Sequence, residues 1–522
     1  MGLFLNPDAI QLIDDRMKVN YVDKSLLIKE LNTIIKINSD KYVCVSRPRR
    51  FGKTMAANMI AAYYTKGCDS HEAFKGLKIE SDPDYEEYIN KYNVLKIDCG
   101  GMYARNLGNM NTVEKITELV VPEFREEFPD LCFPDCCDVA TAIGIVYKAK
   151  KEKFVIIIDE YDVIIRERNE KELTPFLLFL NGLFKDSVLN SAIALSYITG
   201  ILPIVKDMVQ SKLNNFSEYT MLNAYSLAPF IGFTKEEVRI LAENNGMDTA
   251  ELERWYDGYC VDGVELYSPK SVIEAIKRGK CSDYWTATGS YEAIKKYIEL
   301  DCEGIEEDVT RMMAGESVEV NINTYCNSLE TFSSKDDVFT YLIHLGYLAY
   351  DSETKTCRIP NNEIKNQWGD TLRVSKKYKK QSSVMVLSKE LLNATIALDS
   401  DAVASALDRN HEIVTSNLSY NNEQSLQSAI ILAYFYAYDY YTVITEMGTG
   451  KGYADVVMIP FVPDKPALVI ELKKDQSEGK AIAQIKKKHY HSGLERYVGN
   501  TLLVGVNYDS KTKKHTAVIE KA

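Results

Sequence analysis

The sequence predicts an α/β protein with more than one domain. Within the first two hundred residues the apolar runs YVCVS, NVLKID, FVIIID and AIALSYITG alternate with helical patterns, which indicates a parallel sheet flanked by helices. Helical patterns dominate from Phe233 to about residue 410, and strand-like runs return in the last hundred residues. Because 522 residues are too many for one hydrophobic core, we expect a first domain over residues 1–290, a mainly helical connector over 291–405 and a C-terminal α/β domain over 406–522.

Composition limits the class of protein. Apolar residues make up 46% of the chain and charged residues 26%, as in globular proteins. No apolar run is long enough to span a bilayer and the N-terminus lacks a signal pattern, so we expect a cytoplasmic protein without membrane contacts. The net charge of −13 should repel nucleic acid overall, and any such binding needs a local basic patch. Lysines cluster at 376–380 and 486–488, although most such runs are solvated faces.

Cysteine spacing argues against a structural zinc site. The eleven cysteines include no CxxC pair, and only six histidines are present. A metal held by Cys132, Cys136 and Cys137 is the weaker alternative, because no fourth ligand follows at a suitable spacing. A reduced chain without a zinc framework fits these numbers better.

The stretch VCVSRPRRFGKTMAANMIAAYY has the layout of a phosphate-binding loop. An apolar strand leads into a turn that ends Gly52-Lys53-Thr54, and an apolar helix follows. In such loops the backbone N–H groups at the helix start hold phosphates, a lysine reaches the β and γ oxygens, and a threonine ligates Mg²⁺. Lys53 and Thr54 suit these two roles. The usual pattern has a glycine seven positions before the threonine, whereas this chain has Arg47.

A second segment, FVIIIDEYD, supports the same interpretation. Five apolar residues are followed by Asp159 and Glu160 at the expected C-terminal end of a strand. Ligands bind at this end of the strands in an open α/β sheet. Asp159 would hold Mg²⁺ and Glu160 would polarise the attacking water. The alternative is an ordinary buried strand that ends in solvated acids. Together with the Gly-Lys-Thr turn, the segment predicts a P-loop NTPase that binds ATP and Mg²⁺.

Two threonines mark neighbouring elements. Thr199 lies at the end of the run AIALSYITG, just before Gly200. It is placed as the polar residue that would lie between the two phosphate-site segments and sense the γ-phosphate. A strand cap before the turn at Gly200 is an equal alternative. Thr234 opens FTKEEVRILAENN as an expected helix N-cap, with Glu237 at the capping-box position.

Several segments in order resemble one known family. They are YVDKSLLIKEL, SRPRRFGKT, IIIDEYD, TGILPI, IGFTKEEV, RWYDGY, LYSPKSVI and YWTATGS. The chain resembles the AAA-ATPase-like proteins, in which these segments precede a nuclease-like domain of the PD-(D/E)XK superfamily. The resemblance covers nearly the whole chain and includes RPRRFGK as the family's own form of the loop, with Arg47.

The resemblance implies further roles around the loop. It implies that Tyr21 to Asp23 lie near the adenine, that Arg49 and Arg50 lie beside the phosphates, and that Phe51 and Gly52 belong to the binding loop. Two guanidinium groups would supply charge and paired hydrogen bonds there. They could equally bind an acidic neighbour or a partner subunit. In RWYDGY, packing of the aromatic rings is favoured over chemistry.

A second group of chemical residues lies near the C-terminus. In PALVIELKKD, Glu471 and Lys473 share one strand face, and Asp455 of GYADVVMIP can join them from the preceding strand. Metal-assisted phosphodiester cleavage uses such a set: Asp455, Glu471 and the carbonyl of Leu472 would bind Mg²⁺, and Lys473 would orient water and stabilise charge. Solvated strands often carry similar triplets, but this strand is apolar before Glu471.

The resemblance extends this site to a C-terminal restriction-endonuclease-like α/β domain. It implies Glu423 as a further metal ligand and Gln484 as the helix glutamine that follows the ELK strand. It also implies Tyr490 as the end of that segment, and Glu446 at the edge of the site.

Three hypotheses follow. The leading one is an ATP-regulated, Mg²⁺-dependent nuclease that acts on nucleic acid, with DNA favoured over RNA, and that could form homo-oligomers. The second is a nucleotide-driven switch whose C-terminal domain binds without cleaving. The third, a scaffold with two decayed sites, is the weakest because the phosphate and metal residues are retained.

Overall fold

The structure is a computed structural model. It describes residues 2–38, 40–105, 111–167, 170–204, 213–285, 291–300, 302–325, 332, 334–375, 379–414, 423–449, 452–460, 462, 465–488 and 499–522. The chain forms two compact units. Unit 1 contains residues 1–285 and 320–355, and unit 2 contains residues 286–319 and 356–522.

Unit 1 is built on a five-stranded parallel sheet, as the alternating sequence predicts. The strand order is β2-β3-β4-β1-β5. The strands are β1 (Tyr42–Ser46), β2 (Asn93–Asp98), β3 (Phe154–Asp159), β4 (Ile193–Gly200) and β5 (Ser217–Tyr219). The first four coincide closely with the four apolar runs. Because β1, β3 and β4 are buried along their whole length, they read as continuous apolar segments rather than alternating ones.

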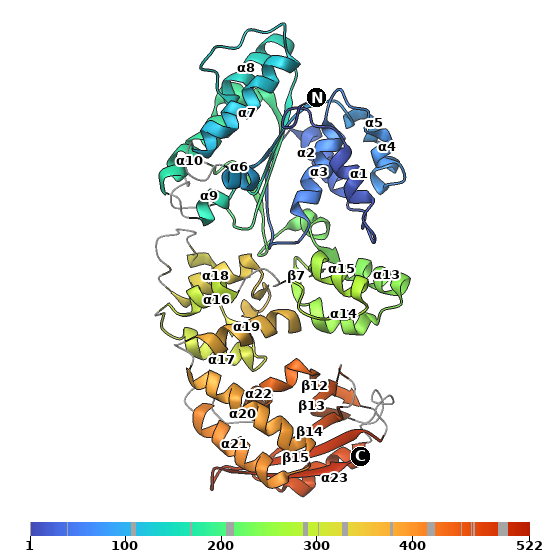
Figure 1. The fold of residues 1–522 in the computed structure, drawn as a ribbon, viewed down its shortest axis with the longest axis vertical. Helices are drawn as coiled ribbons and strands as arrows, with labels where there is room; N and C mark the ends of the chain where they lie inside the picture. Colours follow the sequence, from blue (N-terminus) through green and yellow to red (C-terminus); the bar gives the residue numbers. More distant parts are fainter. Residues whose placement is uncertain are drawn as a thin grey trace. The chain divides into compact units, whose positions relative to one another are not determined.

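Helices cover both faces of this sheet. In Figure 1, α1 (Ile10–Arg16), α2 (Leu26–Ile37) and α3 (Lys53–Tyr64) lie on one side, and α7 (Thr112–Glu127), α8 (Val139–Lys150) and α10 (Glu170–Lys185) lie on the other. The shorter helices are α4 (His71–Phe74), η1 (Lys78–Ser81), α5 (Tyr85–Tyr88), α6 (Cys99–Arg105), α9 (Val163–Arg166) and α11 (Ser187–Ala192). Apolar residues of α7, α8 and α10 pack with those of β2 and β3 in one buried cluster.

The rest of unit 1 is a small helical layer with a three-stranded sheet. Its elements are η2 (Tyr225–Phe230), β6 (Phe233–Thr234), α13 (Lys235–Asn245), α14 (Thr249–Tyr256), β7 (Tyr259–Val261), β8 (Val264–Tyr267), α15 (Pro269–Arg278), η3 (Ile322–Thr324), α18 (Lys335–Leu345) and β10 (Ala349–Asp351). The predicted capping box is confirmed, because Thr234 accepts from the Glu237 N–H and Glu237 accepts from the Thr234 N–H. Trp255, Tyr256 and Tyr259 are buried, so the packing prediction for RWYDGY is also confirmed.

Unit 2 carries a mixed sheet, and its α/β class agrees with the prediction. The strands β12 (Tyr441–Thr449), β13 (Gly452–Pro460), β14 (Ala467–Lys474), β15 (Thr501–Asp509) and β16 (Lys514–Lys521) follow one another in the sheet, and only β14 and β15 are parallel. The other elements are α16 (Tyr291–Ile298), α17 (Ile305–Met313), β9 (Val318–Glu319), β11 (Thr356–Arg358), α19 (Asn362–Val374), α20 (Lys379–Ile396), α21 (Ser400–Val414), α22 (Glu423–Ala433), η4 (Phe435–Asp439) and α23 (Glu478–Lys488).

Helix α23 covers the face of this sheet that carries Asp455 and Glu471. Ile482 and Ile485 of α23 form a buried cluster with Val457 of β13, Val469 of β14 and Leu503 of β15. Since side chains two apart share a strand face, Asp455 and Glu471 belong to the same face as Val457 and Val469.

Within the described ranges, we find no helix that combines the length and apolar character needed to cross a membrane.

Candidate nucleotide and metal sites

The loop between β1 and α3 encloses the amine of Lys53. Gly52 has a φ of +93°, a conformation that glycine adopts without strain, and this lets α3 begin directly at Lys53. The Lys53 Nζ donates to the carbonyls of Arg47 at 3.0 Å and Pro48 at 2.8 Å. Burial lowers the pKa of Lys53 to about 8, although the nearby carboxylates, Asp162 first, oppose this shift. The Lys53 amine therefore lies at a helix N-terminus, the end of a helix that favours phosphate.

Asp159 brings three other predicted residues together at the end of β3. Its Oδ1 accepts from the Thr199 Oγ1 at 3.3 Å and from the Glu160 N–H at 3.0 Å, and the Thr54 hydroxyl acts on the pKa of the same carboxylate. Burial raises the pKa of Asp159, while the Thr54 hydroxyl and the Lys53 charge act in the opposite direction. Because β4 lies between β1 and β3, Thr199 reaches this carboxylate from the neighbouring strand.

Glu160 has an unusual backbone and a partly open side chain. Its φ of +52° is a conformation that costs energy for a non-glycine residue, and such strain is frequent at functional sites. The side chain is 47% exposed and lies 4.0 Å from the Arg166 guanidinium. Burial raises the pKa of Glu160, and Arg166 lowers it in part. A side chain at Gly100 would overlap the Glu160 carboxylate, so the glycine leaves it room.

The other predicted loop residues point in different directions. The Arg50 Nη1 donates to the carbonyls of Tyr284 at 2.9 Å and Trp285 at 2.6 Å. Phe51 is buried against Tyr259, with ring centroids 5.6 Å apart. Arg49 is exposed. The Arg50 guanidinium therefore has carbonyl partners in residues 284–285, and its role beside the phosphates stays a prediction.

The segment that the resemblance places near the adenine is tied to its neighbours by hydrogen bonds. Asp23 accepts from the backbone N–H groups of Ser25 at 2.8 Å and Lys78 at 2.7 Å. Burial raises the pKa of Tyr21 to about 12, so this phenol stays protonated. The adenine contact itself stays a prediction.

The sequence interpretation gave no role to Asp162, which the structure places in the core of this site. Its Oδ2 accepts from the N–H groups of Ile201 and Leu202 at 3.0 Å each, and from the Arg166 Nε at 3.0 Å. The carboxylate thereby holds the turn after β4 against the end of β3. The signal in the sequence is the third acid of IIIDEYD with Arg166 four residues later, one helical turn away.

The position that usually carries glycine, Arg47, is fully buried. Its Nη1 donates to the carbonyls of Ser46 at 3.0 Å, Tyr219 at 3.2 Å and Thr220 at 2.8 Å. Burial lowers the pKa of Arg47 to about 10, so it remains charged at neutral pH. The side chain thus fastens the phosphate-binding loop to the end of β5.

In unit 2, Glu471, Lys473 and Gln484 meet at one carboxylate. Glu471 is fully buried, and its Oε1 accepts from the Lys473 Nζ at 3.1 Å and from the Gln484 Nε2 of α23. The shared strand face of Glu471 and Lys473 was predicted from their spacing, and this contact confirms it. The contact with Gln484 depends on how α23 packs, which strand spacing alone does not give.

Asp455 joins this group from β13. The paired residues of β13 and β14 run as far as Val456 with Ile470, and just beyond them the Asp455 Oδ2 accepts from the Leu472 N–H at 2.7 Å. The Asp455 carbonyl accepts from the Gln427 Nε2 of α22 at 2.6 Å. The Asp455 carboxylate is therefore fixed one strand away from Glu471.

These residues fit a divalent cation. Carboxylate and carbonyl oxygens are the ligands that Mg²⁺ prefers, and here two carboxylates come from adjacent strands, one of them paired with Lys473. Glu423 begins α22, but its side chain, that of Glu446 and all of Tyr490 lie outside the described residues. Among the side chains that the structure does describe, no three His, Cys, Asp or Glu residues form a group suited to a metal, and this includes Cys132, Cys136 and Cys137.

Two family models match separate parts of the chain. Residues 11–210 match the family model for a predicted AAA-ATPase, and residues 421–517 match the model for the PD-(D/E)XK nuclease superfamily. A relative from Azotobacter chroococcum mcd 1, described as an uncharacterized protein in the vnfD 5' region, is 26% identical over 289 residues. The match spans 52% of this chain and 51% of that relative, about half of its length.

Solved structures give weaker similarity. The ORC2 protein of Aeropyrum pernix, in ADPNP and ADP complexes, is 10% identical with a TM-score of 0.28, over 69% of this chain and 98% of that one. The ORC1 protein of Aeropyrum pernix in complex with DNA is 10% identical with a TM-score of 0.25, over 88% of this chain and 94% of that one. From the two family models, the chain contains a predicted AAA-ATPase domain over residues 11–210 and a PD-(D/E)XK nuclease superfamily domain over residues 421–517.

Proposed function

We propose that this protein binds and hydrolyses ATP in unit 1 and cleaves nucleic acid in unit 2, with the bound nucleotide controlling cleavage. The observation that carries the nuclease assignment is the buried Glu471 carboxylate, which is bonded to Lys473 and Gln484 with Asp455 on the adjacent strand. An ion pair of this kind is costly to bury without a purpose, because both charges lose their hydration.

The residues of unit 2 suit metal-dependent phosphodiester hydrolysis. Asp455, Glu471 and the Leu472 carbonyl would hold Mg²⁺, with Glu423 as a further ligand; the bound ion would supply an activated water and neutralise phosphate charge. Lys473 forms an ion pair with the Glu471 carboxylate and would stabilise the negative charge that develops on the phosphate. Gln484 donates to the same Glu471 oxygen as Lys473 and would orient the carboxylate.

The residues of unit 1 suit phosphoryl transfer from a nucleotide. Lys53 and the backbone after Gly52 would bind the phosphates, and Thr54 with Asp159 would hold Mg²⁺. Glu160 is the candidate to orient the attacking water, and Thr199 would report the γ-phosphate through its contact with Asp159. In this proposal Arg49 supplies a charge that is exposed at the loop.

DNA is the favoured substrate, and basic residues near Lys473 would contact its backbone. Lys480 and Lys486 lie on α23, the helix that supplies Gln484. Lys486 is paired with Glu520, so it would have to exchange this partner for a phosphate. Such contacts would make binding strongly dependent on salt.

The experiment is cleavage of labelled single- and double-stranded DNA and of RNA, in Mg²⁺ or Mn²⁺, with and without ATP. The key variant is Lys473→Ala, and Lys474→Ala is its control because the neighbouring residue points to the other face of β14. We expect cleavage to fall by about a thousandfold in Lys473→Ala, as for other groups that stabilise developing charge, and to stay within about threefold of wild type in Lys474→Ala. The variant Lys53→Ala should remove ATP binding and any dependence of cleavage on ATP.

Two results would contradict the proposal. Equal loss in Lys473→Ala and Lys474→Ala would indicate damage to β14 rather than to a catalytic group. No cleavage under any condition, with ATP still bound, would favour the nucleotide-driven switch, in which unit 2 only recognises its ligand.

A further inference from the structure

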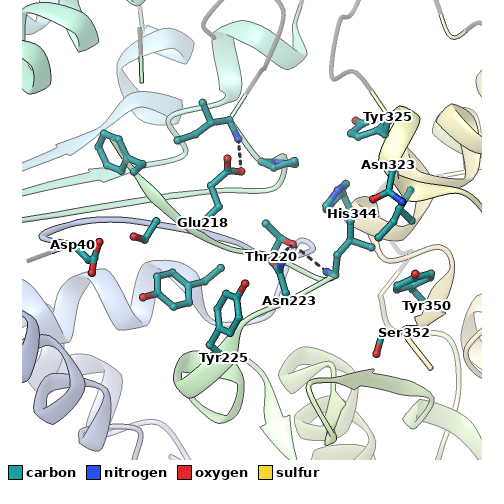
Figure 2. Close-up of a pocket in the computed structure, with 17 residues that line it drawn as sticks. Asp40, Glu218, Thr220, Asn223, Tyr225, Asn323, Tyr325, His344, Tyr350 and Ser352 are labelled. Atoms are coloured by element: carbon teal, nitrogen blue, oxygen red, sulfur yellow. Dashed lines mark hydrogen bonds between the residues drawn. The ribbon is translucent and has the colours of Figure 1, made fainter. Parts of the chain in front are cut away.

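A pocket of about 730 Å³ lies along the edge strand β5, away from the residues assigned to phosphate and metal. One wall is formed by β5 and the turn that follows it, and the other by residues of the 320–355 segment of the same unit. In Figure 2, Asp40, Glu218 and Tyr225 lie on one side, and Asn323, Tyr325, His344 and Tyr350 lie on the other. All the residues that line the pocket therefore belong to unit 1.

The lining is acidic and rich in tyrosine. Asp40 and Glu218 are its two acids, and Tyr219, Tyr225, Tyr325 and Tyr350 are its four tyrosines. None of the residues that line it is Lys or Arg. Tyrosine faces attract cations and carboxylates pair with them, so this lining is complementary to positive charge. The chain as a whole also has a net charge of −13, which steers basic partners towards it.

Asp40 and Glu218 line the same pocket as the tyrosines. Tyr219 and Tyr225 meet edge to face with ring centroids 6.2 Å apart. Burial raises the pKa of Tyr219, and the charge of Asp40 adds to this effect. The Glu218 Oε2 accepts from the Ile204 N–H at 3.2 Å, which fixes the carboxylate at the pocket wall.

The backbone of β5 makes the pocket suited to an extended ligand. β5 pairs with β1 and is the last strand of the sheet among the described strands. Alternate residues of an edge strand direct N–H and C=O groups outward, and an extended peptide can pair with them. Arg47 holds the carbonyls of Tyr219 and Thr220 from inside the sheet, and the Thr220 N–H donates to the Asn223 carbonyl, so the end of this strand is fixed before any partner binds.

We infer that this pocket is a docking site for an extended, lysine- or arginine-rich segment of a partner protein, lying along β5 with its basic side chains between Asp40, Glu218 and the tyrosines. This site is independent of the proposed nuclease and ATPase activities, since it uses none of their residues.

The test is the affinity of the full chain for a labelled synthetic peptide of alternating lysine and serine, measured by fluorescence anisotropy. A peptide of alternating glutamate and serine is the charge control. The variants are Asp40→Asn and Tyr225→Ala, because Asp40 is exposed and Tyr225 is 65% exposed, so neither change should affect folding. Their controls are Glu72→Gln on α4 and Ile240→Ala on α13, two exposed residues outside the pocket.

We expect the lysine peptide to bind and the glutamate peptide not to bind. Asp40→Asn and Tyr225→Ala should each weaken binding about threefold and the double variant about tenfold, while the two controls should match wild type. Equal losses in the controls would show non-specific attraction to an acidic surface and overturn the proposal. Displacement of the peptide by spermine at an equal concentration of charge would also overturn it, because a small cation would then explain the site without a peptide backbone.

Discussion

Phe51 of the phosphate-binding loop packs edge to face against Tyr259 of the RWYDGY segment, with ring centroids 5.6 Å apart and an interplanar angle of 80°. The Tyr259 hydroxyl donates to the Gly346 carbonyl at 2.6 Å, and a side chain at Gly346 would lie 2.7 Å from Pro48 of the same loop. The RWYDGY segment, about two hundred residues further along the chain, therefore packs directly against the phosphate-binding loop. The packing of RWYDGY, which the sequence predicts, stabilises the candidate nucleotide site.

The Phe51 and Tyr259 rings should be energetically coupled in ATP binding. Phe51→Ala and Tyr259→Ala should each weaken ATP affinity, and the double variant should lose less than the sum, with a coupling energy of about 1 kcal/mol as for other aromatic pairs. Isothermal titration with a non-hydrolysable ATP analogue measures this cycle. Additive losses would show that the two rings act on the loop separately. Tyr259→Phe separates the hydroxyl contact with Gly346 from the ring contact.

ATP affinity should fall as the pH rises from 7.5 to about 9.5. The pKa of Lys53 is lowered to about 8 by burial, so the free protein loses the positive charge of this lysine over that range. ATP phosphates are already ionised there, since the second pKa of a phosphate is about 6. Binding should be accompanied by proton uptake, because bound phosphate favours the charged lysine.

The control for this pH dependence is Lys53→Arg. A guanidinium stays protonated across the whole range, so the residual affinity of this variant should change little between the two pH values. A decline of the same size in Lys53→Arg would show that another group is responsible.

Arg47 and Arg49 should differ sharply in their effect on stability. Arg47→Met removes the donor for three carbonyls in the core, and buried carbonyls without a donor cost about 1–3 kcal/mol. The thermal midpoint of unit 1 should fall by about 5 °C or more. Arg49→Met changes an exposed side chain and should leave the midpoint unchanged to within about 1 °C. A small effect of Arg47→Met would mean that removing a buried charge offsets the lost hydrogen bonds.

Lys365 should make the stability of unit 2 depend on pH. Lys365 is buried on α19, its Nζ donates to the Tyr438 hydroxyl at 2.5 Å, and burial lowers its pKa to about 7 from 10.5. Below pH 7 both folded and unfolded chains hold the proton, and the folded chain carries the full cost of a buried charge. Between pH 7 and 10.5 only the unfolded chain keeps the proton, so the free energy of unfolding should rise by up to about 1.4 kcal/mol per pH unit.

Lys365→Met isolates this contribution. The variant should be more stable than wild type at pH 6, and the difference should shrink steadily towards pH 10 when the thermal midpoints are compared at each pH. Parallel curves for the two proteins would show that Lys365 is not the group that titrates.

Much of the fold was readable in the sequence because its signals are local. The apolar runs that became β1, β3 and β4 are buried along their whole length, and this pattern needs no knowledge of distant contacts. The capping box of Thr234 and Glu237 spans a single helical turn. Glu471 and Lys473 share a face because strand geometry alternates side chains regardless of what covers the strand.

The tertiary structure decided which distant segments of the chain contact one another. The contact between Thr199 and Asp159 depends on strand order, which places β4 between β1 and β3. The positions of Arg47 against β5, Phe51 against Tyr259 and Gln484 against Glu471 depend on packing between elements far apart in the chain. Sequence periodicity records which face of an element is buried, but not the partner that buries it. For the same reason the pocket along β5, whose walls come from separate segments, had no signature in the sequence.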